Sequence, residues 1–408
     1  MILIIFPPKR KFFRIYIFNK FSYFLFTKLK ECSIIKMYVY RLGIPEAIIQ
    51  RGTEMVKRHY YELDRLNVLL CLIVVFIHAF GGIVQMLDPN NFLHMMSLSV
   101  LRNCAFAVQG FIFLSALKYG VAADKGKFRY GAFLIKRIRK VLLPYIISVA
   151  VYYICFCSLD YFEEGFSTPV LLRYIYDGTL AAHFYFVIVI MQFYLLMPLW
   201  TRAVRRLPAP VIVISGIIIY CIWVICFAGK TELYDRIFIT YIPFWMAGLA
   251  AGKNYSGFTN LIKKDVVKIT AAFIMLAIID GSGFYITENT LITAYFFEII
   301  HMLYAFSAIL FTSAVCMYTD SKLSFFTGAV NSLSYEIYLW HCLLLTYIDR
   351  FIDIISPASV RGFAAIRVGG IYIIIFAFCL VHAAVKAGIN GRRTASGRNR
   401  QKHNKERF

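Results

Sequence analysis

Long apolar stretches recur along the chain, and they restrict its fold more than any other feature of the sequence. Hydrophobic residues make up 60% of the 408 residues, and only 16% are charged. A stretch of roughly 20 apolar residues is long enough to cross the hydrocarbon core of a bilayer, where helices satisfy their own backbone hydrogen bonds. The sequence therefore predicts an all-α integral membrane protein, a bundle of about ten transmembrane helices. The candidate spans lie near residues 66–87, 98–119, 141–159, 181–200, 209–228, 236–252, 266–280, 292–317, 331–348 and 365–388.

The basic residues predict how these spans are oriented. Most Lys and Arg residues lie in the loops on the side of both tails, whereas the opposite loops hold acidic residues such as Asp160, Glu163 and Asp235. Cytoplasmic loops carry the excess of positive charge in membrane proteins, so both termini are expected in the cytoplasm. The net charge of +22 does not indicate nucleic-acid binding, because the basic residues fall in short loops and tails and no DNA- or RNA-binding motif occurs.

The two ends of the chain differ in composition from the spans. Residues 1–54 mix aromatic and basic residues without a clean apolar core or a small-residue cleavage site, so they are not a signal peptide. They are interpreted either as an interfacial amphipathic arm or, preferably, as an upstream extension of the reading frame with Met55 as the start. Residues 60–390 are expected to form the transmembrane domain, and 391–408 a disordered basic tail near anionic lipid.

The first span contains one histidine, His78, within the otherwise apolar run "LLCLIVVFIHAF". Ionisable side chains inside a membrane are costly, so each marks a candidate site. On a helix, Asn67 lies about 20° and Asp64 about 40° from His78, whereas Arg65 points to roughly the opposite side. Asp64, Asn67 and His78 are therefore predicted to form a polar stripe from the cytoplasmic end to the middle of the membrane.

Two later spans contain further polar groups that are candidates for the same site. Ser334, Tyr338 and His341 share one face of the segment "SLSYEIYLWH", at spacings of seven and three residues. Glu298 and His301 lie one helical turn apart, where they are able to pair with each other. For the Glu298–His301 pair, a structural role is preferred over a functional one.

The cysteines do not predict a metal centre. Nine of the ten cysteines lie in or beside apolar segments, no CxxC occurs, and the spacing of Cys155 and Cys157 is poor for zinc. The cysteines are interpreted as small buried apolar side chains. His183 is a further candidate site residue, although it lies near the outer end of its span, where a histidine can also simply reach the headgroups. No metal ion and no bound cofactor are expected.

A basic segment, "KRIRKVLLPY", precedes the third span and contains Lys136, Arg137, Arg139 and Lys140. These residues are interpreted either as ordinary positive-inside residues or as a cytoplasmic clamp for an anion. The planar fork of arginine suits phosphate. Coenzyme A carries a pyrophosphate and a 3′-phosphate and resides in the cytoplasm, so acyl-coenzyme A is the predicted partner.

Several stretches, in order, resemble the landmarks of the acyltransferase family 3 membrane proteins, in the short form without an extracellular domain. The resemblance covers residues from about 60 to 390. The stretches are "LDRLNVLLCLIVVFIH", "GFIFLSALK", "KRIRKVLLPY", "HFYFVIVIMQFYLLMPL", "IPFWMAGLAAG" and "SLSYEIYLWH".

The resemblance implies a multi-pass O-acyltransferase of a bacterial plasma membrane. The family moves an acyl group, usually acetyl, from cytoplasmic acyl-coenzyme A to a hydroxyl of a sugar or glycan at or across the membrane. It implies that His78 is catalytic, that Arg137 and Lys140 hold the donor, and that Tyr338 and His341 belong to a late signature. One departure is Asn67, which stands where the family usually has an arginine.

Three functions are compatible with this pattern. As an enzyme, the protein would use His78 as general base on an acceptor hydroxyl or as a nucleophile. As an exporter of polysaccharide or small solutes, it would use the polar stripe as a permeation path. As a non-catalytic partner in envelope assembly, it would tolerate substitution of His78. The basic segment at 136–140 favours the enzyme, because a coenzyme A donor needs it.

Overall fold

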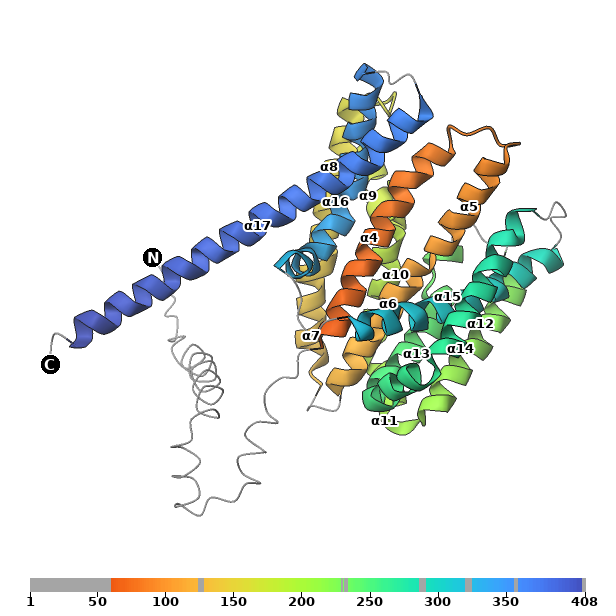
Figure 1. The fold of residues 1–408 in the computed structure, drawn as a ribbon, viewed down its shortest axis with the longest axis horizontal. Coiled ribbons are helices and arrows are strands. Elements are labelled where there is room, and N and C mark those ends of the chain that lie inside the picture. Colours follow the sequence, from red (N-terminus) through yellow and green to blue (C-terminus); the bar gives the residue numbers. More distant parts are fainter. Residues whose placement is uncertain are drawn as a thin grey trace, which may run out of the picture. The chain divides into compact units, whose positions relative to one another are not determined.

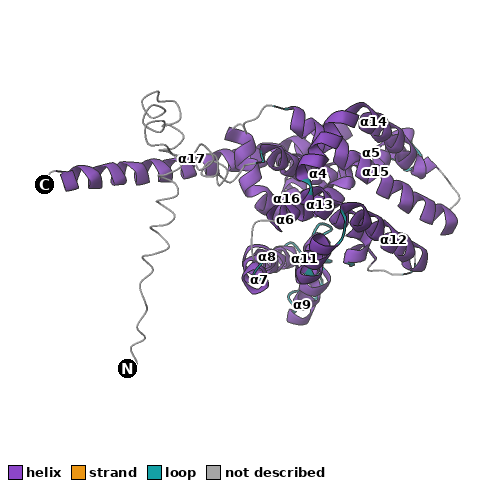
Figure 2. Ribbon diagram, turned by 90° about the horizontal axis from the view of Figure 1, so that it is seen from below, coloured by secondary structure: helices purple, strands orange, loops and turns teal. Residues whose placement is uncertain are grey.

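The computed structural model describes residues 60–123, 128–228, 230, 234–285, 291–319, 325–355 and 359–405. The chain divides into two units, Met1–Tyr60 and Tyr61–Phe408. The interpretation of residues 1–54 lies outside the described residues, so the description that follows concerns the second unit. Throughout the described part of that unit, every regular element is a helix (Figures 1 and 2).

The helices follow one another with short connections, and some joints are bends within a continuous helical path. The single residue Ala105 separates the second and third helices, and η1 is a π-helical turn that joins α7 directly to α8. In chain order the elements are α4 (Tyr61–Val84), α5 (Phe92–Cys104), α6 (Phe106–Ala123), α7 (Tyr130–Arg137), η1 (Ile138–Leu142), α8 (Leu143–Ser158), α9 (Thr168–Asp177), α10 (Tyr185–Leu195), α11 (Met197–Arg206), α12 (Ala209–Phe227), η2 (Tyr234–Arg236), η3 (Phe238–Tyr241), α13 (Ile242–Lys253), α14 (Tyr255–Gly281), η4 (Ser282–Tyr285), α15 (Leu291–Tyr318), α16 (Phe325–Ile355) and α17 (Val360–Lys405).

Six helical segments of the described chain are long and apolar enough to cross a membrane. A seventh is added if α10 and α11, which meet at 58°, count as one broken span. The protein is therefore a helical chain with several candidate membrane spans, as predicted, but the count of ten spans is not confirmed. The six segments are Tyr61–Val84, Phe92–Ala122, Tyr130–Ser158, Ala209–Phe227, Tyr295–Tyr318 and Val360–Val385.

Three of the predicted spans fall on helices outside this set, for different reasons. α13 has 12 residues, which is too short for a bilayer core of about 30 Å. α14 is long enough but carries Lys263, Lys264, Asp265 and Lys268 near its start. α16 has 31 residues, and its polar face lowers its hydropathy.

α4 is the helix around which the candidate site is built. It packs against α6, α15, α16 and α17 (Figure 1). Val75 and Ala79 of α4, Ile337 of α16 and Ile371 of α17 belong to one buried apolar cluster. α12, in contrast to α4, carries a row of exposed isoleucines, which are expected to face lipid. They are Ile214, Ile218, Ile222 and Ile225.

Small residues bring α6 and α13 into close contact. A Cβ atom at Gly248 would lie 2.3 Å from the carbonyl oxygen of Phe113, and one at Gly252 would lie 2.4 Å from that of Leu117. Close backbone approach at small residues four apart is typical of helix pairs in membranes. This contact holds α6 in place, and α6 in turn packs against α4, the helix that carries His78.

α17 extends further than the sequence predicts. Its helix continues to Lys405, whereas residues 391–408 are expected from composition to be a disordered tail. The segment from 386 to 405 contains no proline, and its Lys, Arg, Gln and Ala residues favour helix, whereas Gly388, Gly391 and Gly397 disfavour it. A basic tail can therefore continue the helix that precedes it.

Candidate functional site

The polar faces predicted on the first and ninth spans meet in the structure. The Asn67 side-chain amide on α4 donates hydrogen bonds to Asn331 Oδ1 and to Ser334 Oγ on α16, both at 2.9 Å. One turn further along α4, the Cys71 thiol donates to the Ser334 carbonyl at 3.6 Å. The stripe of α4 therefore lies against α16 and not against lipid.

Arg65 is directed away from this contact, as its position on the helix predicts. It donates hydrogen bonds to the carbonyl of Cys316, at 2.6 Å, and to Thr319 at the end of α15. Arg65 therefore does not substitute for the arginine that Asn67 replaces. Asp64, at the start of the stripe, lies 4.0 Å from the ammonium group of Lys118 on α6.

Three histidines from three separate segments gather beyond this stripe. The ring centroid of His78, on α4, lies 5.0 Å from that of His341, on α16, and 5.9 Å from that of His183. His183, in the turn before α10, lies 4.8 Å from His341. His341 is fully buried and His183 is 3% exposed. These three rings are called the histidine cluster below, and His183 belongs to it instead of reaching the headgroups.

The hydrogen bonds of the cluster assign roles to individual ring nitrogens. Because a carbonyl oxygen only accepts, His341 Nδ1 carries the hydrogen that it donates to the Tyr338 carbonyl at 2.8 Å. Its Nε2 is then left with a lone pair, and it lies 3.3 Å from the Cys342 sulfur. By the same reasoning His183 Nε2 donates to the Leu339 carbonyl at 3.3 Å. The Nδ1 atom of His183 is buried without a hydrogen-bond partner.

Two tyrosines hold the histidine cluster in place. The Tyr338 hydroxyl donates to the His183 carbonyl. The Tyr152 hydroxyl, from α8, donates to the Leu339 carbonyl at 2.8 Å and accepts from the Leu343 amide at 2.8 Å. Leu339 and Leu343 are the pair that would bond directly in a regular helix, so Tyr152 is inserted into the backbone ladder of α16 beside His341.

A buried arginine holds the backbone of α4 at His78, and sequence reasoning missed it. Arg367 on α17 forms two hydrogen bonds with the Asp349 carboxylate, at 2.6 and 2.9 Å, and donates to the carbonyls of His78, at 2.9 Å, and Ala79. A Cβ atom at Gly82 would lie 2.4 Å from this guanidinium. The signal that could have found Arg367 is its position in an apolar span, where an arginine is costly without a partner.

The basic segment lies further toward the start of α16. Lys136, Arg139 and Lys140 are exposed, whereas Arg137 is half-buried, with its guanidinium 4.5 Å from the ring centroid of Tyr194. Arg139 and Lys140 are part of η1, and π-helical turns frequently occur at functional sites.

One hydrogen bond fixes η1 beside α16. The Tyr335 hydroxyl donates to the Val141 carbonyl at 2.7 Å. From Tyr335 to His341 a helix rises by about 9 Å. Val141, which directly follows the basic residues, is therefore bound to α16 less than two helical turns before His341.

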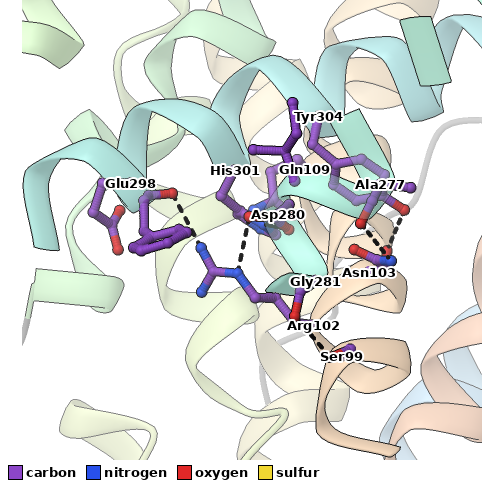
Figure 3. A network of polar contacts seen from close by, with 12 residues as sticks. Ser99, Arg102, Asn103, Gln109, Ala277, Asp280, Gly281, Glu298, His301 and Tyr304 are labelled. Atoms are coloured by element: carbon purple, nitrogen blue, oxygen red, sulfur yellow. Dashed lines mark hydrogen bonds and ion pairs between the residues drawn. The ribbon is translucent and has the colours of Figure 1, made fainter. Parts of the chain in front are cut away.

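The predicted pairing of Glu298 with His301 is wrong. His301 Nδ1 donates to the buried Asp280 carboxylate of α14 at 2.8 Å, and Arg102 binds the other oxygen of Asp280 at 2.9 Å (Figure 3). The Glu298 carboxylate instead accepts from the Tyr220 hydroxyl at 3.3 Å. A fully buried carboxylate needs charged or hydrogen-bonding partners. His301 is one of the partners of Asp280 and is therefore not paired with Glu298. This network joins α5, α14 and α15, and its described contacts are not with the histidine cluster.

These features describe a multi-pass helical membrane protein with a polar site inside the bundle, and comparison with known proteins identifies its family. A family model described as an acyltransferase domain matches residues 60–383. The match covers most of the chain, and the chain belongs to this family, acyltransferase family 3.

Curated relatives carry a different functional name. The chain is similar to proteins of Staphylococcus aureus strains MSSA476 and MRSA252 named "probable poly-beta-1,6-N-acetyl-D-glucosamine export protein". Each is 22% identical over 322 residues, which cover 73% of this chain and 86% of the relative. No solved structure gives a significant match.

Proposed function

We propose that the protein is an O-acyltransferase embedded in a bacterial plasma membrane. It moves an acyl group, in the first instance acetyl, from cytoplasmic acyl-coenzyme A to a hydroxyl of a cell-envelope sugar or glycan. The observation that carries the proposal is the convergence of His78, His183 and His341 at the end of a polar stripe. Intramembrane ionisable groups that face one another and not lipid mark a functional pathway.

In this mechanism His78 is the general base. Its ring takes the proton from the acceptor hydroxyl while the oxygen attacks the carbonyl carbon of the thioester. The carbon–sulfur bond then breaks, and the proton passes from His78 to the departing coenzyme A thiolate. The products are an ester on the glycan and free coenzyme A. A positioned base contributes about 10²–10⁴-fold to such a reaction, and the dry bundle interior and the alignment of both substrates contribute the rest.

The neighbouring groups divide into donor-binding and positioning roles. Arg137 and Lys140 bind the phosphates of the donor at the cytoplasmic end of the bundle, with Lys136 and Arg139 adding charge. The acyl-bearing arm then follows α16 toward the histidine cluster. His341, whose Nδ1 donates to the backbone, can only accept at Nε2, which suits it to receive a hydrogen bond from a second hydroxyl of the acceptor sugar and so to orient the sugar toward His78.

The second candidate function is export of a polysaccharide, and the name of the similar staphylococcal proteins favours it. The same polar contact between α4 and α16 would then line part of a path for sugar. The two functions differ in their use of the basic segment and of His78. An exporter has no obvious requirement for a phosphate clamp at residues 136–140, and its output is surface glycan and not acetate.

The experiment that separates them measures base-labile acetate and total surface glycan in cells carrying the wild type, a deletion, His78→Ala or His382→Ala. His382 lies on α17 in the membrane-spanning region, outside the histidine cluster, and is the matched control. Acetate that falls by at least about 100-fold in the deletion and His78→Ala cells, with constant glycan, supports transfer. Loss of surface glycan with intracellular accumulation contradicts it and supports export.

A further inference from the structure

Cys342 lies inside the histidine cluster but has no part in the proposed transfer. Its sulfur is 3.3 Å from His341 Nε2. Single ligand atoms of His78, His341 and Cys342 all lie within 4.8 Å of one another. Two imidazole nitrogens and one sulfur at this spacing form the type of donor set that zinc and other thiophilic cations prefer. Such sets are uncommon in a membrane interior, where isolated polar groups are costly.

The hydrogen bonds of His341 leave its Nε2 lone pair beside the Cys342 sulfur. His341 donates from Nδ1 to the backbone carbonyls of Tyr338 and Ile337, at 2.8 and 3.1 Å. A hydrogen bond from the far ring nitrogen to a carbonyl is the arrangement that orients metal-binding histidines. The Nδ1 atom of His183, in the adjacent ring, is buried and unpartnered. The cluster therefore offers more electron-pair donors than it has hydrogens to satisfy them.

The size and charge of the cluster are compatible with an ion. A zinc ion bonds nitrogen at about 2.0–2.1 Å and sulfur at about 2.3 Å, so tetrahedral ligand atoms are separated by roughly 3.3–3.8 Å. Closing the observed spacing requires side-chain shifts of about 1 Å. The nearby positive charge, Arg367, is already paired with the Asp349 carboxylate, so it adds little repulsion. One thiolate and two neutral imidazoles would neutralise one of the two positive charges of the ion and leave the other to the open position.

We propose that His78, His341 and Cys342 bind a thiophilic divalent cation, Zn²⁺ or Cd²⁺, with the fourth position open to water or to His183. Binding exchanges the ion's water ligands for protein ligands and releases the Cys342 thiol proton to solvent. Only the functional consequence rests on the proposed acyl transfer. An ion on His78 occupies the lone pair that the base needs, so the site inhibits the enzyme.

The binding test titrates full-length protein, purified in detergent, with Cd²⁺ and follows the thiolate-to-cadmium absorption in the ultraviolet. The expected result is one ion per chain, no thiolate absorption in Cys342→Ala, and binding at least about 10-fold weaker in that variant. Cys226→Ser, which removes an exposed thiol on α12, is expected to bind as the wild type does. Unchanged cadmium absorption in Cys342→Ala, or none in the wild type, overturns the site.

The second measurement follows acetyl transfer by the same proteins against Zn²⁺ concentration, with each variant compared to its own metal-free rate. Inhibition that requires at least about 10-fold more Zn²⁺ in Cys342→Ala supports the inhibitory role. A chelator-treated wild type that needs Zn²⁺ for transfer overturns it. If no variant transfers acetate, the proposed function fails, while the cadmium titration still decides whether the cation site exists.

Discussion

At the scale of single residues, the polar groups inside the bundle are arranged to fix His78 and not merely to satisfy one another. The His78 backbone carbonyl accepts from Nη1 of Arg367, whose Nε and Nη2 atoms bind the two carboxylate oxygens of Asp349. Arginine suits this role because its guanidinium is planar and presents several donors in fixed directions. The pair thus connects α17 and α16 to the residue proposed to carry the chemistry.

Replacement of Arg367 by lysine is expected to separate positioning from charge. Lysine keeps the positive charge but loses the bidentate contact and the bonds to α4. We expect kcat to fall roughly tenfold, which corresponds to about 1.4 kcal/mol of transition-state stabilisation, with KM for acetyl-coenzyme A unchanged. The measurement is steady-state transfer by purified protein. Arg361→Lys, an exposed position on α17, is the control, and equal kcat values for the two variants would remove Arg367 from the positioning of His78.

At the scale of helices, the spacing of polar residues predicts which helix faces meet. It does not predict which residues distant in sequence pair with each other. The contact of Asn67 with Ser334 follows from the polar stripe and face read from the sequence, because both are costly toward lipid. The insertion of Tyr152 into α16 and the pairing of His301 with Asp280 join residues distant in sequence. Spacing within one helix contains no information about such partners, and for that reason the local pairing of Glu298 with His301 is wrong.

Tyr152→Phe is expected to change the local shape of α16 with little effect on stability. Without the hydroxyl, the Leu343 amide can bond directly to the Leu339 carbonyl, so no buried donor is left unpaired. The free energy of unfolding should change by less than about 1 kcal/mol, while the rate of transfer falls because His341 and His183 lose their present alignment. The check compares thermal unfolding with kcat in one preparation; a rate equal to that of the wild type would show that the inserted hydroxyl has no role in alignment.

Gly248→Val tests the close contact between α6 and α13. Its side chain would meet the Phe113 carbonyl and Ala116, and overpacking of this kind costs about 1–3 kcal/mol. We expect a lower temperature of unfolding in detergent. Gly369→Val, on α17, is the matched control because nothing lies within 4 Å of its added Cβ. Equal unfolding temperatures for the two variants would contradict the close approach of α6 and α13.

At the scale of the whole molecule, the position of His78 along α4 relates the proposed reaction to the two sides of the membrane. From Asp64 to His78 the helix rises about 21 Å, and from His78 to Val84 only about 9 Å. If both termini are cytoplasmic, the histidine cluster lies nearer the outer surface. A cytoplasmic donor must then reach inward from the basic segment, and an acceptor from outside has the shorter path.

This arrangement depends on the predicted orientation, which labelling of introduced cysteines in intact cells can test. In a background in which the ten native cysteines are replaced by serine, an impermeant maleimide should label Glu164→Cys, between α8 and α9, without permeabilisation. It should label Arg205→Cys, at the end of α11, only after permeabilisation; both native side chains are exposed. The physical reason is that basic loops are retained in the cytoplasm. The reverse pattern would place the basic segment outside the cell, away from coenzyme A, and acyl transfer from a cytoplasmic donor would no longer fit the molecule.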